Sequence, residues 1–173
     1  MRLATLLAGT ALLGASLAAH ADLTGNTVTC AEAGSGSSFE CNVPSATVGS
    51  GVEFQIGNSA DPDYINADFT SSGLTLTFTV DQDLSATILD FQDTTTPFTS
   101  ETLDSQTGIS GFSASNVSLN DGVLSIDLRG TTESTGDNAV IGLTTAATPE
   151  PSSIMLLGSG LLGIAGVARR RFV

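Results

Sequence analysis

Apolar and polar residues alternate along much of the chain between residues 50 and 145. In the clearest run, Leu74, Leu76, Phe78 and Val80 alternate with three threonines. Side chains alternate between the two faces of a β-strand, so this pattern predicts a strand with one buried and one solvated face. Threonine is β-branched and suits the solvated face. The same alternation predicts strands at 52–56, 65–69, 87–91, 110–119, 123–128 and 139–143.

Short polar segments rich in glycine separate these runs. The tripeptide Asn120-Asp121-Gly122 predicts a tight hairpin, because Gly122 can adopt the positive φ that such a turn requires. Segments 33–38 and 131–138 are expected to be exposed loops. The 19 glycines favour turns over helices. Together these features predict an all-β fold, an antiparallel β-sandwich of jelly-roll-like form.

The first 21 residues have the layout of a secretory signal. Arg2 is followed by an apolar stretch at 3–17, and Ala19-His20-Ala21 fits a cleavage site before Asp22. The alternative is a first transmembrane helix, but a span needs about 20 apolar residues. We therefore expect a signal peptide at 1–21, cleaved after Ala21 with Ala19 as the second small residue of the site.

Removing both ends leaves a very acidic segment at 22–148. Of the five basic residues only Arg129 lies within it, and of the 18 acidic residues only Glu150 lies outside it. Such a surface repels phosphate backbones, which excludes nucleic acid as an expected partner. It suits a soluble extracytoplasmic protein or a hydrated polymer matrix. We expect one passenger domain at 22–148.

Two cysteines, Cys30 and Cys41, lie in this segment. An exported protein meets an oxidising compartment, so an even pair predicts a disulfide, and two buried free thiols are the alternative.

The residues needed for most enzymatic mechanisms are missing from the passenger. Its sequence has no histidine and no lysine to activate a nucleophile, because His20 lies in the predicted signal peptide. Paired carboxylates could serve a glycosidase, but so acidic a chain contains many such pairs by composition alone. We expect a non-enzymatic protein without a required cofactor.

A calcium site is a candidate, because carboxylates in loops between strands can bind hard cations. The first ligands to consider are Asp61, Asp63 and Asp68 in the segment DPDYINAD. The alternative is that they are solvated turn residues, since aspartate is common in turns.

The C-terminal residues 149–173 combine three features in a fixed order. Pro149-Glu150-Pro151 precedes an apolar segment at 154–168, and Arg169, Arg170 and Arg171 follow it. As a helix, those fifteen apolar residues span about 22 Å, less than the roughly 30 Å of a bilayer core. The arginines would stop transfer and stay in the cytoplasm, which leaves the passenger outside. The two prolines keep their segment extended beside the membrane, where an enzyme can reach it.

This tail resembles the PEP-CTERM sorting signal of Gram-negative and some other environmental bacteria. The resemblance implies cleavage at Pro149-Glu150-Pro151 by exosortase, a membrane transpeptidase-like enzyme, and an association with exopolysaccharide and biofilm. It also agrees with a β-sandwich passenger of uncharacterised activity.

The sequence therefore predicts an exported protein held transiently in the inner membrane, with its passenger on the periplasmic side, and then sorted to the cell surface or matrix. Two alternatives stay open at this point. One is a calcium- or carbohydrate-binding extracellular module, and the other is a permanently anchored single-pass membrane protein.

Overall fold

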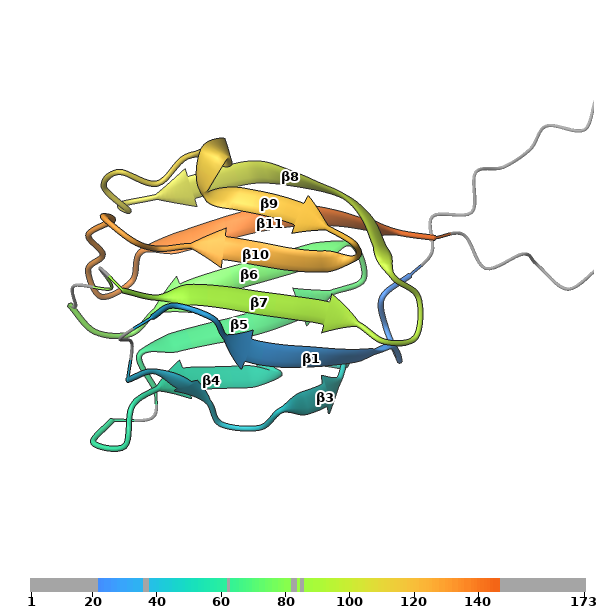
Figure 1. Cartoon of the computed structure of the whole chain (residues 1–173), viewed down its shortest axis with the longest axis horizontal. Coiled ribbons are helices and arrows are strands. Elements are labelled where there is room, and N and C mark those ends of the chain that lie inside the picture. The colour runs from blue at the N-terminus through green and yellow to red at the C-terminus, as the bar shows by residue number, and fades with distance from the viewer. Residues whose placement is uncertain (1–21, 36–37, 62, 82–83, 85, 147–173) are drawn as a thin grey trace, which may run out of the picture.

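The computed structural model describes residues 22–146, apart from 36–37, 62, 82–83 and 85. Two antiparallel sheets pack face to face in this part of the chain (Figure 1). The strands are β1 (Thr27–Glu32), β2 (Glu40–Cys41), β3 (Ser45–Thr47), β4 (Phe54–Gly57), β5 (Ile65–Thr70), β6 (Gly73–Phe78), β7 (Ile88–Asp93), β8 (Phe98–Thr107), β9 (Val117–Asn120), β10 (Val123–Asp127) and β11 (Asn138–Thr145), with a 3₁₀ turn η1 (Ala114–Asn116) before β9. The signal peptide and the C-terminal helix that the sequence predicts lie outside the described residues.

The two sheets have different sizes and connections. One has five strands in the order β3-β1-β7-β10-β9, and the other has six in the order β2-β4-β5-β6-β11-β8. Strands β4, β5 and β6 form a direct meander. The antiparallel sandwich is confirmed, and its jelly-roll-like form stays a prediction.

The core lies between the sheets and is built from the alternating positions. In β5, Ile65, Ala67 and Phe69 are fully buried, as the alternation predicted. Phe69 packs against Phe91 of the other sheet, with ring centroids 5.4 Å apart. Phe54 also contacts Phe91, at 5.9 Å. These rings join the two sheets into one hydrophobic core.

The predicted hairpin between β9 and β10 is confirmed. Asn120 pairs with Val123, so Asp121 and Gly122 alone form the loop. Both have positive φ, 51° and 79° respectively. Two successive positive values define the type I′ turn that matches the right-handed twist of the flanking strands.

Three sequence predictions need correction. Val52 is 48% exposed and precedes β4, which begins only at Phe54. The segment 110–119 is mostly irregular and reaches strand form at Val117, because Gly111 has a φ of 81° that interrupts an extended chain. The segment 131–138 is partly buried: Thr131 and Glu133 are each 2% exposed. Thr132 forms a β-bridge with Ser110, which holds this segment against the sandwich.

Candidate functional site

The described part of the chain ends directly after the last strand of the sandwich. Thr145 ends β11 and pairs with Phe98 of β8. Ala146 then donates its backbone N–H to the carbonyl of Pro97, at 3.1 Å. Because these bonds fix the chain up to Ala146, only residues 147 and 148 separate the folded domain from Pro149.

The first described residues lie at the same end of the sandwich as Ala146 (Figure 1). Leu23 is fully buried, and its backbone N–H donates to the carbonyl of Ser71 at 3.1 Å. Gly25 donates to Val48 at 2.8 Å. Asp22 accepts a bond from the N–H of Thr24, which lowers the pKa of this exposed carboxyl. We call this region the terminal end; it comprises residues 22–26, 48–53, 71–72, 94–97, 121–122 and 145–146.

A buried carboxylate holds the terminal end together. Asp93, at the end of β7, is 1% exposed. Its Oδ2 accepts from Asn26 Nδ2 at 2.6 Å, and its Oδ1 accepts from the backbone N–H groups of Thr95 and Thr96 at 2.7 and 2.9 Å. Thr96 Oγ1 adds a contact with Oδ2 at 3.3 Å. The carboxylate therefore ties the N-terminal segment to the β7–β8 turn.

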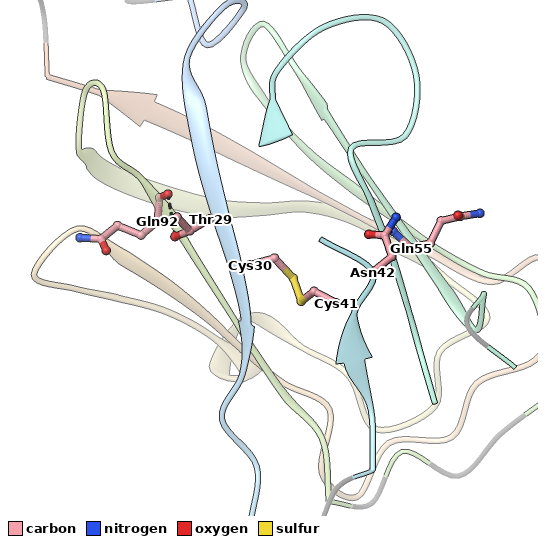
Figure 2. Close-up of a disulfide and its surroundings, with 6 residues drawn as sticks. All are labelled: Thr29, Cys30, Cys41, Asn42, Gln55 and Gln92. Atoms are coloured by element: carbon pink, nitrogen blue, oxygen red, sulfur yellow. Dashed lines mark hydrogen bonds between the residues drawn. A yellow bond between two sulfur atoms is a disulfide. The ribbon is translucent and has the colours of Figure 1, made fainter. Parts of the chain in front are cut away.

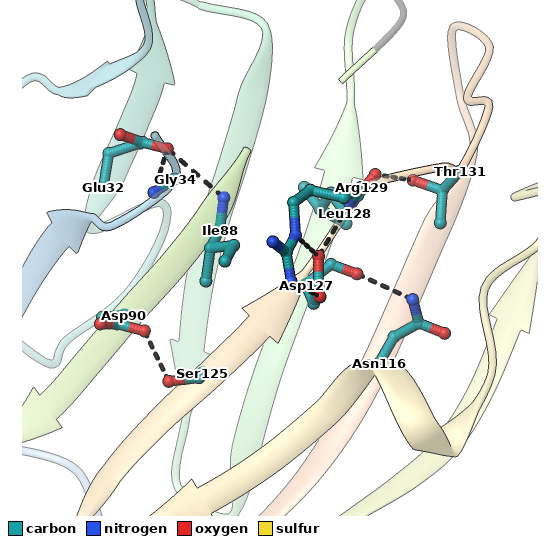
Figure 3. A network of polar contacts seen from close by, with 10 residues as sticks. All are labelled: Glu32, Gly34, Ile88, Asp90, Asn116, Ser125, Asp127, Leu128, Arg129 and Thr131. Atoms are coloured by element: carbon teal, nitrogen blue, oxygen red, sulfur yellow. Dashed lines mark hydrogen bonds and ion pairs between the residues drawn. The ribbon is translucent and has the colours of Figure 1, made fainter. Parts of the chain in front are cut away.

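The opposite end of the sandwich carries longer connections and the one ion pair of the described residues. Figure 3 shows Arg129 against Asp127, with Nη2 and Oδ2 2.6 Å apart. The hydrogen bond from the guanidinium holds the pKa of the Asp127 carboxyl below its ordinary value and raises the pKa of Arg129. The Arg129 side chain is 55% exposed and that of Asp127 35%, so solvent screens the pair and it adds little to stability.

Other carboxylates near this end are occupied by hydrogen bonds within the fold. Glu32 Oε1 accepts from the N–H of Gly34 at 2.7 Å, and Asp90 Oδ1 accepts from Ser125 Oγ at 2.6 Å (Figure 3). Glu133 accepts a hydrogen bond from the Thr131 hydroxyl, which also donates to the Leu128 carbonyl. This buried group was missed from the sequence, where Glu133 lies in a stretch that is polar throughout.

The three candidate calcium ligands do not form a metal site. Asp68 lies on β5 with an intermediate exposure, on the face opposite the buried Phe69. Asp61 and Asp63 lie in the β4–β5 connection, where Asp61 Oδ1 accepts from the N–H of Asp63 at 3.3 Å. In the described ranges no three residues among His, Cys, Asp and Glu are placed to hold a metal ion. For Asp61 and Asp63 this local bond matches the alternative, that of carboxylates in a turn.

The structure joins Cys30 and Cys41 in a disulfide that links the two sheets (Figure 2). Cys30 lies on β1, in the five-stranded sheet, and Cys41 on β2, at the edge of the six-stranded sheet. Beside it is an open cleft of about 430 Å³. Its lining residues are Cys30, Glu32, Phe39, Glu40, Cys41 and Pro44. With both cysteines oxidised, the cleft contains no thiol nucleophile.

Replacing both cysteines by serine should lower the free energy of unfolding by about 2–3 kcal/mol, because the closed loop restricts the unfolded chain. Chemical denaturation followed by circular dichroism would measure the change. The parent protein in reductant is the matched control and should unfold at the same denaturant concentration as the double variant. An unchanged midpoint in both samples would contradict a stabilising role for the Cys30–Cys41 link.

The remaining predicted site residues lie outside the described residues: Ala19 and Ala21, Pro149, Glu150 and Pro151, and Arg169, Arg170 and Arg171. Within the part of the chain that the structure does describe, no helix is long and apolar enough to cross a membrane. The membrane segment predicted at 154–168 lies outside the described residues and stays a prediction from the sequence.

The described residues form an acidic, disulfide-linked β-sandwich, and the C-terminal segment follows its last strand directly in the sequence. Comparison with protein families identifies that segment: residues 147–171 match the PEP-CTERM protein-sorting motif. Searches of curated proteins and of solved structures found no match to the chain. The chain therefore carries a PEP-CTERM sorting motif, which begins one residue after the last described residue of the sandwich.

Proposed function

We propose that this chain is a non-enzymatic exported protein that exosortase processes at its PEP-CTERM tail and that becomes part of the cell surface or its exopolysaccharide matrix. The match at 147–171 carries this proposal, because the motif implies processing by a membrane exosortase and delivery to the cell surface. The boundary supports it as well. The last described strand ends at Thr145, so cleavage at Pro149-Glu150-Pro151 would leave every described strand of the sandwich in the released part.

The composition of the passenger agrees with a structural role. Between residues 22 and 148 the sequence has neither histidine nor lysine, and Arg129 is its single basic residue. General-base activation of a nucleophile therefore lacks its usual side chains. A strongly acidic surface keeps such a domain hydrated and soluble.

The test is expression of the full chain in a bacterium that has an exosortase, with and without that enzyme. Mass spectrometry of the surface fraction should show a mature N-terminus at Asp22 and a C-terminus near residues 149–151. Loss of the enzyme should leave the passenger in the membrane fraction.

The variant Pro149→Ala/Pro151→Ala should accumulate in the membrane, because it removes the two residues that keep the motif extended. Ser152→Ala/Ser153→Ala changes the next two residues, which follow the Pro149-Glu150-Pro151 tripeptide, and is the matched control. Recovery of the parent chain from the membrane with Val173 intact, in the presence of exosortase, would contradict the proposal and support a permanent anchor.

A further inference from the structure

The distance between the folded domain and the processing motif is very short. The chain is fixed at Ala146 by its bond to Pro97, and Pro149 follows three residues later. A fully extended chain gains at most about 3.6 Å per residue, so the two Cα atoms can lie no more than about 11 Å apart. An enzyme that binds six extended residues around the motif would cover about 20 Å of chain. Such an enzyme would meet the sandwich itself.

The terminal end cannot easily release more chain. Thr145 is 7% exposed, and its strand pairs with β8 as far as Thr145 and with β6 as far as Gly142. Leu143 also donates to the carbonyl of Ser72 at 2.9 Å. Lengthening the tether would therefore require β11 to separate from the sheet and to expose core residues.

The exposed surface of the terminal end carries little charge. Glu53 is half-buried, and its two carboxylate oxygens are engaged: Oε1 accepts from the N–H of Gly49 and Oε2 from the N–H of Phe69, at 2.9 and 2.7 Å. The Asp93 carboxylate is buried as described above. Two exposed carboxylates, Asp22 and Asp121, remain among the described residues of this end.

An exposed apolar side chain lies on the same surface. Across the ranges that the structure describes, Val52 is the one large hydrophobic residue that is exposed, at 48%. It belongs to the 48–53 loop, which Gly25 contacts through its bond to Val48. The neighbouring Ser50 is also exposed. A single exposed apolar residue is ordinary on a protein surface. Contact with another protein is favoured here by the low surface charge of an end that a three-residue tether holds beside the motif.

We propose that the terminal end of the sandwich is a docking surface for the exosortase, which would bind the folded passenger together with the PEP motif. This inference rests on the proposed function, because it assumes that exosortase cleaves this tail. In addition, the enzyme would contact residues that lie far from the motif in sequence. The 48–53 loop is the contact that substitutions can test most directly.

The test compares processing rates of charge variants at the two ends of the sandwich by pulse-chase labelling in the exosortase-containing host. Ser50→Glu/Val52→Glu adds two carboxylates to the terminal end. We expect it to slow processing about fivefold or more, because unpaired charge in an interface opposes association. Ser59→Glu/Ala60→Glu adds the same charge to exposed positions of the opposite end, and should stay within about twofold of the parent rate.

A linker separates docking from other effects of the added charge. Sixteen Gly and Ser residues inserted between Ala147 and Thr148 would let the tail reach the enzyme without the sandwich. In that background the Ser50→Glu/Val52→Glu effect should fall to within about twofold, because a long flexible tether removes the enforced contact. Unchanged melting temperatures of both double variants would show that folding is intact.

Equal rates for the two double variants, with the parent chain processed normally, would overturn the docking surface and leave the proposed function standing. A slow Ser50→Glu/Val52→Glu variant whose defect persists with the linker would also overturn it. Failure of the parent chain to be processed at all would instead contradict the proposed function.

Discussion

Replacing Phe69 by alanine is expected to lower the free energy of unfolding by about 3–5 kcal/mol, because a large buried side chain would leave a cavity. Phe69 is fully buried on β5. Its ring lies 6.2 Å from that of Phe54, 5.4 Å from that of Phe91 and 6.4 Å from that of Phe98. Removing it would take away contacts within its own sheet and across to the other sheet.

Urea denaturation followed by far-ultraviolet circular dichroism would measure the loss. Val52→Ala is the matched control, since Val52 is 48% exposed and should change stability by less than about 0.5 kcal/mol. If Phe69→Ala does not unfold at a clearly lower urea concentration than Val52→Ala, the aromatic cluster is not the centre of the core.

The alternating pattern predicted the central strands because one face of each is buried and the other is solvated. β5, β6, β10 and β11 all have this property. β8 does not: most of its residues after Phe98 are exposed or half-buried, so it lacked the apolar period and was missed. Its strand form comes from pairing with β11, a contact between residues far apart in the chain. Such a strand forms through its hydrogen bonds to the neighbouring strand, and the apolar pattern of its own residues does not predict it.

The features of the candidate site also differ in whether the sequence alone could predict them. The sorting motif is a contiguous sequence, so it could be recognised from residues 149–171 without any fold. The terminal end depends on topology, since Asn26 and Asp93 are 67 residues apart. Asp61, Asp63 and Asp68 are close in sequence, which suggested that they bind one calcium ion together. Asp68, however, is placed by the β5 register opposite Thr75, on a sheet face and away from the loop.

Replacing Asp93 by alanine should be the other strongly destabilising change, at about 3 kcal/mol or more, because buried donors would lose their acceptor. Asn26 Nδ2 and the backbone N–H groups of Thr95 and Thr96 all donate to this carboxylate. The loss should be measured by urea denaturation. Gln92→Ala, one position earlier on β7 and exposed, is the matched control and should be nearly neutral.

A double-mutant cycle with Asn26→Ala would show whether the Asp93 cluster works as a unit. Asn26 and Asp93 share one hydrogen bond of 2.6 Å, so the double variant should lose less stability than the two single variants lose together. Additive losses would show that the two side chains act independently. In that case the carboxylate would stabilise the β7–β8 turn alone, and the N-terminal segment would be held by the burial of Leu23 and its backbone bonds.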